Sequence, residues 1–121
     1  FSIDTDIDIR SQGVKIEIGS DGNIYLLGNY AGTVDFDPSA ASTLLSTSGN
    51  GATDIFVAKY NPSLSFVWVK KLSSIGLMYE YGSSIALDQN DNVYVCGRFD
   101  GTFDIDTSIL TDNLVSDGGW D

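Results

Sequence analysis

The sequence contains no histidine and a single cysteine, Cys96. The absence of histidine excludes the usual general base, the Ser-His-Asp and Cys-His arrangements, and zinc sites built on imidazole. One cysteine can form no disulfide within the chain and cannot build a structural zinc site. Because Cys96 lies within an apolar run, we expect it to be a small buried hydrophobic residue.

Basic residues are also scarce, with 6 lysines and arginines against 17 acids and a net charge of −11. Such a surface repels phosphate backbones and anionic lipids, so nucleic-acid and membrane-surface partners are not expected. No apolar run approaches the roughly 20 residues needed to span a bilayer. The acidic surface has two explanations: it keeps a β protein soluble and protects its edges, or it binds calcium through clustered carboxylates.

Proline is rare, at 2 residues, whereas glycine is frequent, at 13, and β-branched residues occur in short runs. No segment shows a sustained period of 3.6, so we expect no helix. The 42% of apolar residues is enough to build a core, which argues against disorder. The composition therefore predicts an all-β protein with many turns.

The chain repeats itself at a constant offset, which matches Gly13 with Gly82 and Asp37 with Asp106. Residues 13–37 read GVKIEIGSDGNIYLLGNYAGTVDFD, and residues 82–106 read GSSIALDQNDNVYVCGRFDGTFDID. A fixed period of this size indicates modular units that bury apolar surface against one another. We therefore divide the chain into residues 1–12, the end of a preceding unit or a linker, a first unit at 13–81, and an incomplete second unit at 82–121.

Within the first unit, alternating or continuous apolar runs predict four strands, joined by turns rich in glycine, asparagine and aspartate. They lie at 14–18, 23–28, 54–60 and 66–72, with an excursion at 33–36 and a weak strand near 43–46. The second copy predicts matching strands at 84–88, 92–97 and 102–105. Four-stranded antiparallel sheets in tandem are typical of β-propeller blades, so we expect a partial propeller.

Several phrases occur in the same order as in a known family. They are Ile85-Ala86-Leu87-Asp88, Asn92-Val93-Tyr94-Val95, Gly97, the segment 32–38 (GTVDFDP), the segment 54–62 (DIFVAKYNP) and Trp68-Val69-Lys70. Over residues 13–121 the chain resembles the SBBP repeats of bacterial seven-bladed β-propellers. It departs at Leu64-Ser65, where the family usually has glycine and a polar residue, and at Thr107, which replaces the counterpart of Pro38. The resemblance implies large exported or surface-anchored bacterial proteins and supplies no catalytic motif.

One and a half units cannot close a ring and would expose an apolar face at each end. We therefore expect a fragment whose partners are further blades of the same longer chain. Identical copies that complete a ring or fibre are an alternative, as is a short sandwich that hides its own edges.

Paired carboxylates are the remaining catalytic possibility, since glycoside hydrolysis needs two acids across a cleft. The candidates by residue type are Glu17, Asp35, Asp37, Glu80, Asp104 and Asp106. The aspartates recur at the same place in both copies, which favours a structural role or a repeated ion site over catalysis. We therefore predict a protein that is not an enzyme.

Asp35 and Asp37, like Asp104 and Asp106, flank an apolar residue, so both carboxylates of each pair face one side of an extended strand. They either cap turns on an edge strand or bind Ca²⁺, with loop carbonyls and water completing the shell. No cofactor is required on the first explanation, and Ca²⁺ is the candidate on the second.

Most aromatic residues recur between the copies and are expected in the core, whereas Tyr79 and Tyr81 lie in the variable segment and are the candidates for ligand contact. We predict a non-catalytic scaffold or adhesion module of a bacterial secreted or cell-surface protein, which contacts a surface glycan or protein through its loops. The alternatives are blades of a polysaccharide-degrading propeller enzyme and a calcium-stabilised subunit of a surface fibre.

Overall fold

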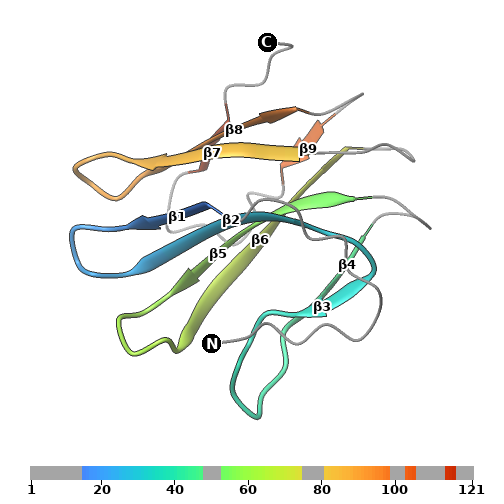
Figure 1. Cartoon of the computed structure of the whole chain (residues 1–121), viewed down its shortest axis with the longest axis horizontal. Helices are drawn as coiled ribbons and strands as arrows, with labels where there is room; N and C mark the ends of the chain where they lie inside the picture. The colour runs from blue at the N-terminus through green and yellow to red at the C-terminus, as the bar shows by residue number, and fades with distance from the viewer. Residues whose placement is uncertain (1–14, 48–52, 75–80, 99–102, 106–113, 117–121) are drawn as a thin grey trace.

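The computed structural model describes residues 15–47, 53–74, 81–98, 103–105 and 114–116. These residues form strands and turns and contain no helix, which confirms the predicted all-β class (Figure 1). The strands are β1 (Lys15–Ile18), β2 (Ile24–Tyr30), β3 (Thr33–Asp35), β4 (Leu44–Ser46), β5 (Asp54–Tyr60), β6 (Phe66–Ser74), β7 (Tyr81–Leu87), β8 (Val93–Arg98), β9 (Phe103–Ile105) and β10 (Leu114–Ser116).

The first unit contains the predicted four-stranded sheet. Its strands lie in the order β1-β2-β5-β6, each antiparallel to its neighbour. The two central strands, β2 and β5, are buried along almost their whole length, because both of their faces carry apolar residues that other layers cover. β1 is exposed throughout and forms one edge.

The turns that follow β1 and β7 occupy matching places in the two copies and have the same backbone geometry. The N–H of Gly19 donates to the carbonyl of Asn23 at 2.8 Å, and Asp88 donates in the same way to Asn92 at 3.2 Å. The fourth residue of each turn has a positive φ, 82° at Gly22 and 59° at Asp91. Both predicted hairpin turns are therefore confirmed, although only the first copy has glycine at the left-handed position.

Apolar layers cover both faces of the central sheet. On one face, β7 of the second unit lies against β1, β2 and β5 (Figure 1). On the other face, the hairpin formed by β3 and β4 contributes Val34 and Phe36 to a second cluster with Phe56 and Tyr60. The predicted excursion is thus a two-stranded cover, and the weak strand near 43–46 is confirmed as β4.

The second unit differs from the first in two strands. β9 is the counterpart of β3, yet it pairs with β6 of the first unit, with Asp104 opposite Ser73. β10 lies beside β8 in a parallel arrangement, in the position that β5 holds beside β2.

The expectation of a buried Cys96 is wrong, because this residue lies on the outer face of β8 and is exposed. The unit boundaries at residues 12 and 81 stay predictions.

Candidate functional site

An apolar contact joins the two repeat units. Tyr25 and Leu27 of β2, both fully buried, pack in one apolar cluster with Ile85 of β7 and Val93 of β8. Trp68 closes the side of this cluster with its ring edge-on to Tyr25, at 6.2 Å between centroids. On this face each unit therefore shields the apolar side chains of the other from solvent, as expected for stacked repeats.

Gly82 shows why the second copy requires glycine at its start. A Cβ atom at this position would lie 2.9 Å from Cδ1 and 3.0 Å from Cγ of Leu27, closer than packed carbon atoms approach. The backbone N–H of Gly82 also donates to Oδ1 of buried Asn29 at 2.8 Å. Glycine therefore permits the close approach of β7 to β2.

A second polar contact joins the turns at one end of the two units. Asp91, in the turn after β7, accepts hydrogen bonds from the N–H of Ser20 at 3.0 Å and from its hydroxyl at 2.8 Å. The left-handed backbone of Asp91 places its carboxylate over the neighbouring turn. We call this contact the turn bridge. Sequence analysis missed it, because nothing local to either turn indicates which turn lies beside it.

Other carboxylates in these turns are used within their own turn. Hydrogen bonds from Asn23 lower the pKa of Asp21, and those from the side chain and backbone of Asn92 lower the pKa of Asp88. Asp88 also accepts the hydroxyl of Tyr94 at 3.1 Å, and this bond to a carboxylate raises the pKa of Tyr94. These aspartates therefore serve as turn caps.

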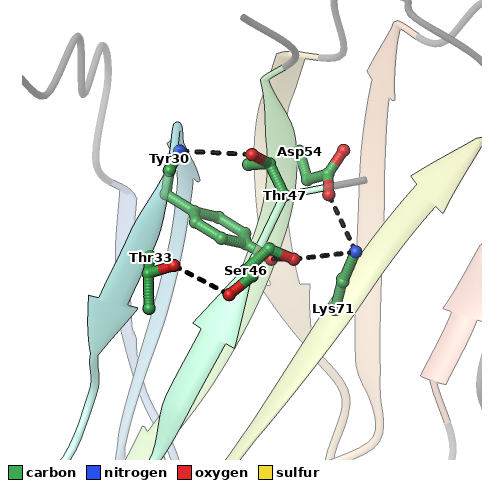
Figure 2. A network of polar contacts seen from close by, with 7 residues as sticks. Tyr30, Thr33, Ser46, Thr47, Asp54 and Lys71 are labelled. Carbon is green, nitrogen blue, oxygen red and sulfur yellow. Dashed lines mark hydrogen bonds and ion pairs between the residues drawn. The ribbon is translucent and has the colours of Figure 1, made fainter. Parts of the chain in front are cut away.

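The β3–β4 hairpin is tied to the central sheet by a polar network, shown in Figure 2. The carbonyl of Ser46 accepts from the hydroxyl of Tyr30 at 3.3 Å and from Nζ of Lys71 at 2.9 Å. Lys71 also forms an ion pair at 3.0 Å with Asp54, whose side chain is only 3% exposed. Thr33 and Ser46 share a hydroxyl contact of 2.8 Å across the hairpin. This arrangement fixes the hairpin and offers no open catalytic group.

The predicted calcium pair Asp35 and Asp37 lies at the end of β3. Oδ1 of Asp35 accepts the N–H of Asp37 at 3.0 Å and of Thr43 at 2.9 Å, and Oδ1 of Asp37 accepts the N–H of Ser39 at 2.9 Å. Within the described ranges, no three acidic, histidine or cysteine side chains come together around a possible metal position. Asp104 lies in β9 with its side chain undescribed, and Asp106 lies outside the described residues. Calcium binding stays a prediction for both pairs.

Melting in calcium and in chelator distinguishes the two roles of these aspartates. Because Asp35 and Asp37 already cap backbone amides, we expect the melting temperature to be the same in millimolar Ca²⁺ and in EDTA. The Asp35→Asn variant, which keeps an acceptor oxygen, is expected to melt close to the unchanged chain in both buffers. A calcium-dependent rise that Asp35→Asn abolishes would instead establish a metal site.

Tyr60 joins the hairpin to β5 through a buried hydrogen bond. Its hydroxyl donates to the carbonyl of Phe36 at 2.7 Å. Burial, with the added charges of Asp37 and Asp35, raises the pKa of Tyr60 to about 12 from its ordinary value of 10.0. The neutral hydroxyl is therefore the form that the fold requires.

The alkaline stability of the chain should report this buried hydroxyl. Well below pH 10 Tyr60 is neutral in both states, whereas between pH 10 and about 12 it is ionised to a much greater extent in the unfolded chain than in the folded one. The free energy of unfolding should therefore fall by about 2 kcal/mol across this interval because of Tyr60. Denaturant unfolding of the chain and of Tyr60→Phe at pH 9 and pH 11.5 measures it. Equal pH dependence in both proteins would refute this role.

The structure does not place the two candidates for ligand contact, Tyr79 and Tyr81, in a common site within the described residues. Tyr79 lies outside them, and Tyr81 begins β7 with its side chain undescribed.

Sequence analysis missed a pocket of about 310 Å³ between the β3–β4 loop and the β5–β6 turn. It is lined by Asp37, Pro38, Ser39, Leu64, Ser65 and Phe66. Leu64 has a φ of 64°, a left-handed backbone conformation that glycine adopts more readily than leucine.

The acids considered for catalysis form no described pair across a cleft. Glu17 is exposed on β1, Asp35 and Asp37 cap the hairpin loop, and Glu80 lies outside the described residues. The described part of the chain also contains no helix that is long and apolar enough to cross a membrane. The described geometry thus favours a role in packing the two units together over a catalytic site at any one position.

Comparison with known proteins identifies a viral relative. The chain is similar to an uncharacterised WD repeat-containing protein of Acanthamoeba polyphaga mimivirus, with 31% identity over 101 residues. The match covers 74% of this chain and 7% of that protein. No family description matches the sequence, and no solved structure matches it. The predicted bacterial cell-surface or extracellular location is contradicted, because this relative is encoded by a virus. The comparison supports a likeness to propeller-forming repeats.

Proposed function

We propose that this chain is a non-catalytic scaffold made of β-propeller-like repeat units of the SBBP kind. It binds a partner protein or glycan through the loops that connect its strands. The similarity to a WD repeat-containing protein supports the repeat architecture, while the partner is our own inference. Neighbouring units and exposed loops, rather than a catalytic centre, carry the function in this proposal.

One observation carries the proposal most strongly: the two units form a single apolar cluster and, within the described residues, are also linked by side-chain hydrogen bonds at two separate places. The cluster joins Leu27 to Ile85, the first polar contact is Gly82 to Asn29, and the second is the turn bridge. A stack of this kind positions successive loops rigidly at one end, which is how repeat proteins build extended binding surfaces.

The pocket beside Leu64 is a hollow on the loop surface that could contact a partner. Leu64 is 44% exposed and stands at the pocket between two loops, next to the polar groups of Asp37 and Ser39. An exposed apolar residue beside hydrogen-bonding groups suits recognition of a protein or glycan. We therefore assign the partner contact to this end of the first unit.

Two measurements test the scaffold proposal. A panel of glycosides, peptides and phosphoesters should show no turnover by the chain, and turnover that Glu17→Gln or Asp35→Asn abolishes would establish an enzyme instead. Arrays of purified proteins and glycans should give binding that Leu64→Asp removes while circular dichroism stays unchanged. Val67→Asp is the matched control, because Val67 is 45% exposed but does not line the pocket.

A further inference from the structure

The pocket between the β3–β4 loop and the β5–β6 turn brings a carboxylate and apolar side chains together. We propose that it receives the side chain of an arginine from a partner protein. In this contact the guanidinium donates to the carboxylate of Asp37, and the aliphatic stem packs against Leu64 and Phe66. The inference rests on the proposed function and deepens it, since it names the chemistry of the partner that these loops bind.

On the loop side of the pocket, the backbone donors are already used within the loop. The N–H of Asp37 donates to Oδ1 of Asp35 at 3.0 Å, and the N–H of Ser39 donates to Oδ1 of Asp37 at 2.9 Å. Pro38, between them, has no N–H. An anionic ligand such as a phosphate or carboxylate therefore meets no free backbone donor on this side.

The turn side of the pocket is arranged in the same way. The N–H of Leu64 donates to the carbonyl of Asn61 at 2.9 Å, and the N–H of Ser65 donates to Oδ1 of Asn61 at 2.9 Å. Both donors thus close the turn and do not face a ligand. Five of the six residues that line the pocket therefore offer no backbone donor, which excludes the usual basis of an anion site.

Asp37, in contrast, keeps an acceptor available for a ligand. Its Oδ1 accepts the N–H of Ser39, while its Oδ2 takes part in no hydrogen bond or ion pair with the residues that the structure describes. The residue is half-buried, so a donor that reaches this oxygen is partly shielded from water. The pocket therefore suits a ligand that donates hydrogen bonds and carries positive charge.

The charges around the pocket are negative. Asp37 and Asp35 both add to the rise in the pKa of Tyr60, whose hydroxyl lies behind the loop. Lys71 forms its ion pair in the network of Figure 2, and Lys59 lies over an aromatic ring on the other face of the sheet. The chain as a whole carries a net charge of −11, which attracts a basic partner and repels an acidic one.

The size and walls of the pocket favour arginine over the other basic ligands. A volume of about 310 Å³ is at the small end of ligand pockets, which suits one side chain rather than an oligosaccharide. Leu64 is 44% exposed, and Phe66 beside it is half-buried. A guanidinium is weakly hydrated and packs on aromatic side chains while it donates to a carboxylate. A lysine ammonium loses more hydration at the same place and should bind more weakly.

Titration of the full chain with three capped tripeptides tests the proposal. The probes are acetyl-Gly-Arg-Gly-amide and its analogues with lysine or with citrulline, which is the neutral analogue of arginine. We expect NMR shifts at the amides of Ser39 and Ser65 and binding of the arginine probe at least about fivefold tighter than that of the citrulline probe. Added salt should weaken the binding of the arginine probe and leave that of the citrulline probe unchanged.

The Asp37→Asn variant isolates the carboxylate, because asparagine keeps an oxygen that can accept the N–H of Ser39. This variant should bind the arginine probe at least about fivefold more weakly and should no longer distinguish it from the citrulline probe. Glu17→Gln is the matched control, because it removes the same charge from an exposed position that does not line the pocket. It should bind every probe like the unchanged chain.

Three results would overturn the inference: no shift at the pocket amides, equal binding of the arginine and citrulline probes, or an equal loss of binding in Asp37→Asn and Glu17→Gln. The proposed function survives each of them if array partners still bind through Leu64, because that test does not depend on Asp37. Binding of the arginine probe without binding of any protein on the array would overturn the assignment of the arginine to a protein and point to a free guanidino compound.

Discussion

Replacing Leu27 with alanine is expected to lower the free energy of unfolding by about 2–5 kcal/mol, the range for a leucine truncated in a tightly packed core. Leu27 is fully buried between the two units and touches the position where a Cβ of Gly82 would lie. The cavity therefore opens at the interface itself. Beyond the overall loss, the amide protons of β7 and β8 should exchange faster with solvent than those of β5.

Leu26 provides the matched control, because it directly precedes Leu27 in β2 and is also buried, at 5% exposed. Its side chain lies on the opposite face, in the cluster under the β3–β4 hairpin. Leu26→Ala should therefore cost a similar free energy without selectively releasing β7 and β8. If both variants had the same effect on hydrogen exchange in the second unit, the interface would not depend on Leu27.

Replacing Phe36 with alanine is expected to cost about 3–5 kcal/mol, the upper range for single truncations. Phe36 is 1% exposed, and its ring lies 4.6 Å from that of Phe56 and 5.8 Å from that of Tyr30. Its carbonyl also accepts the buried hydroxyl of Tyr60. The variant should detach the β3–β4 hairpin from the central sheet, and denaturant unfolding followed by circular dichroism measures the loss.

Phe36→Leu is the control for this prediction, since it keeps most of the apolar volume and should cost less than about 1.5 kcal/mol. Hydrogen exchange should locate the damage of Phe36→Ala at β3 and β4 before it reaches β7. A loss below about 1 kcal/mol would show that the hairpin is an appendage rather than part of the core.

Much of the architecture is predictable from the sequence, because the repeat and the apolar periods are local signals. The continuous apolar runs of β2 and β5 and the turn residues around Gly22 and Asp88 each predict the structure that is found. The alternation in β1 correctly predicts a strand, but the buried face that it also predicts is wrong, because β1 is exposed throughout. The constant offset between the two copies also predicts that the units have equivalent hairpins.

Contacts between units were not predictable in the same way. The pairing of β9 with β6, the parallel position of β10 and the turn bridge at Asp91 depend on which segments meet in space. The exposure of Cys96 has the same cause: an apolar run fixes a strand but not which of its faces a neighbour covers. The role of Asp35 likewise depends on an amide in a later segment, that of Thr43.

Hydrogen exchange measured against denaturant concentration tests most directly whether the two units form one structure. Amides of β2 and β5 in the first unit should open with the same free energy as amides of β7 and β8 in the second, because a shared core unfolds as one cooperative element. Opening of β7 and β8 at a clearly lower free energy, while β2 and β5 stay protected, would contradict the account.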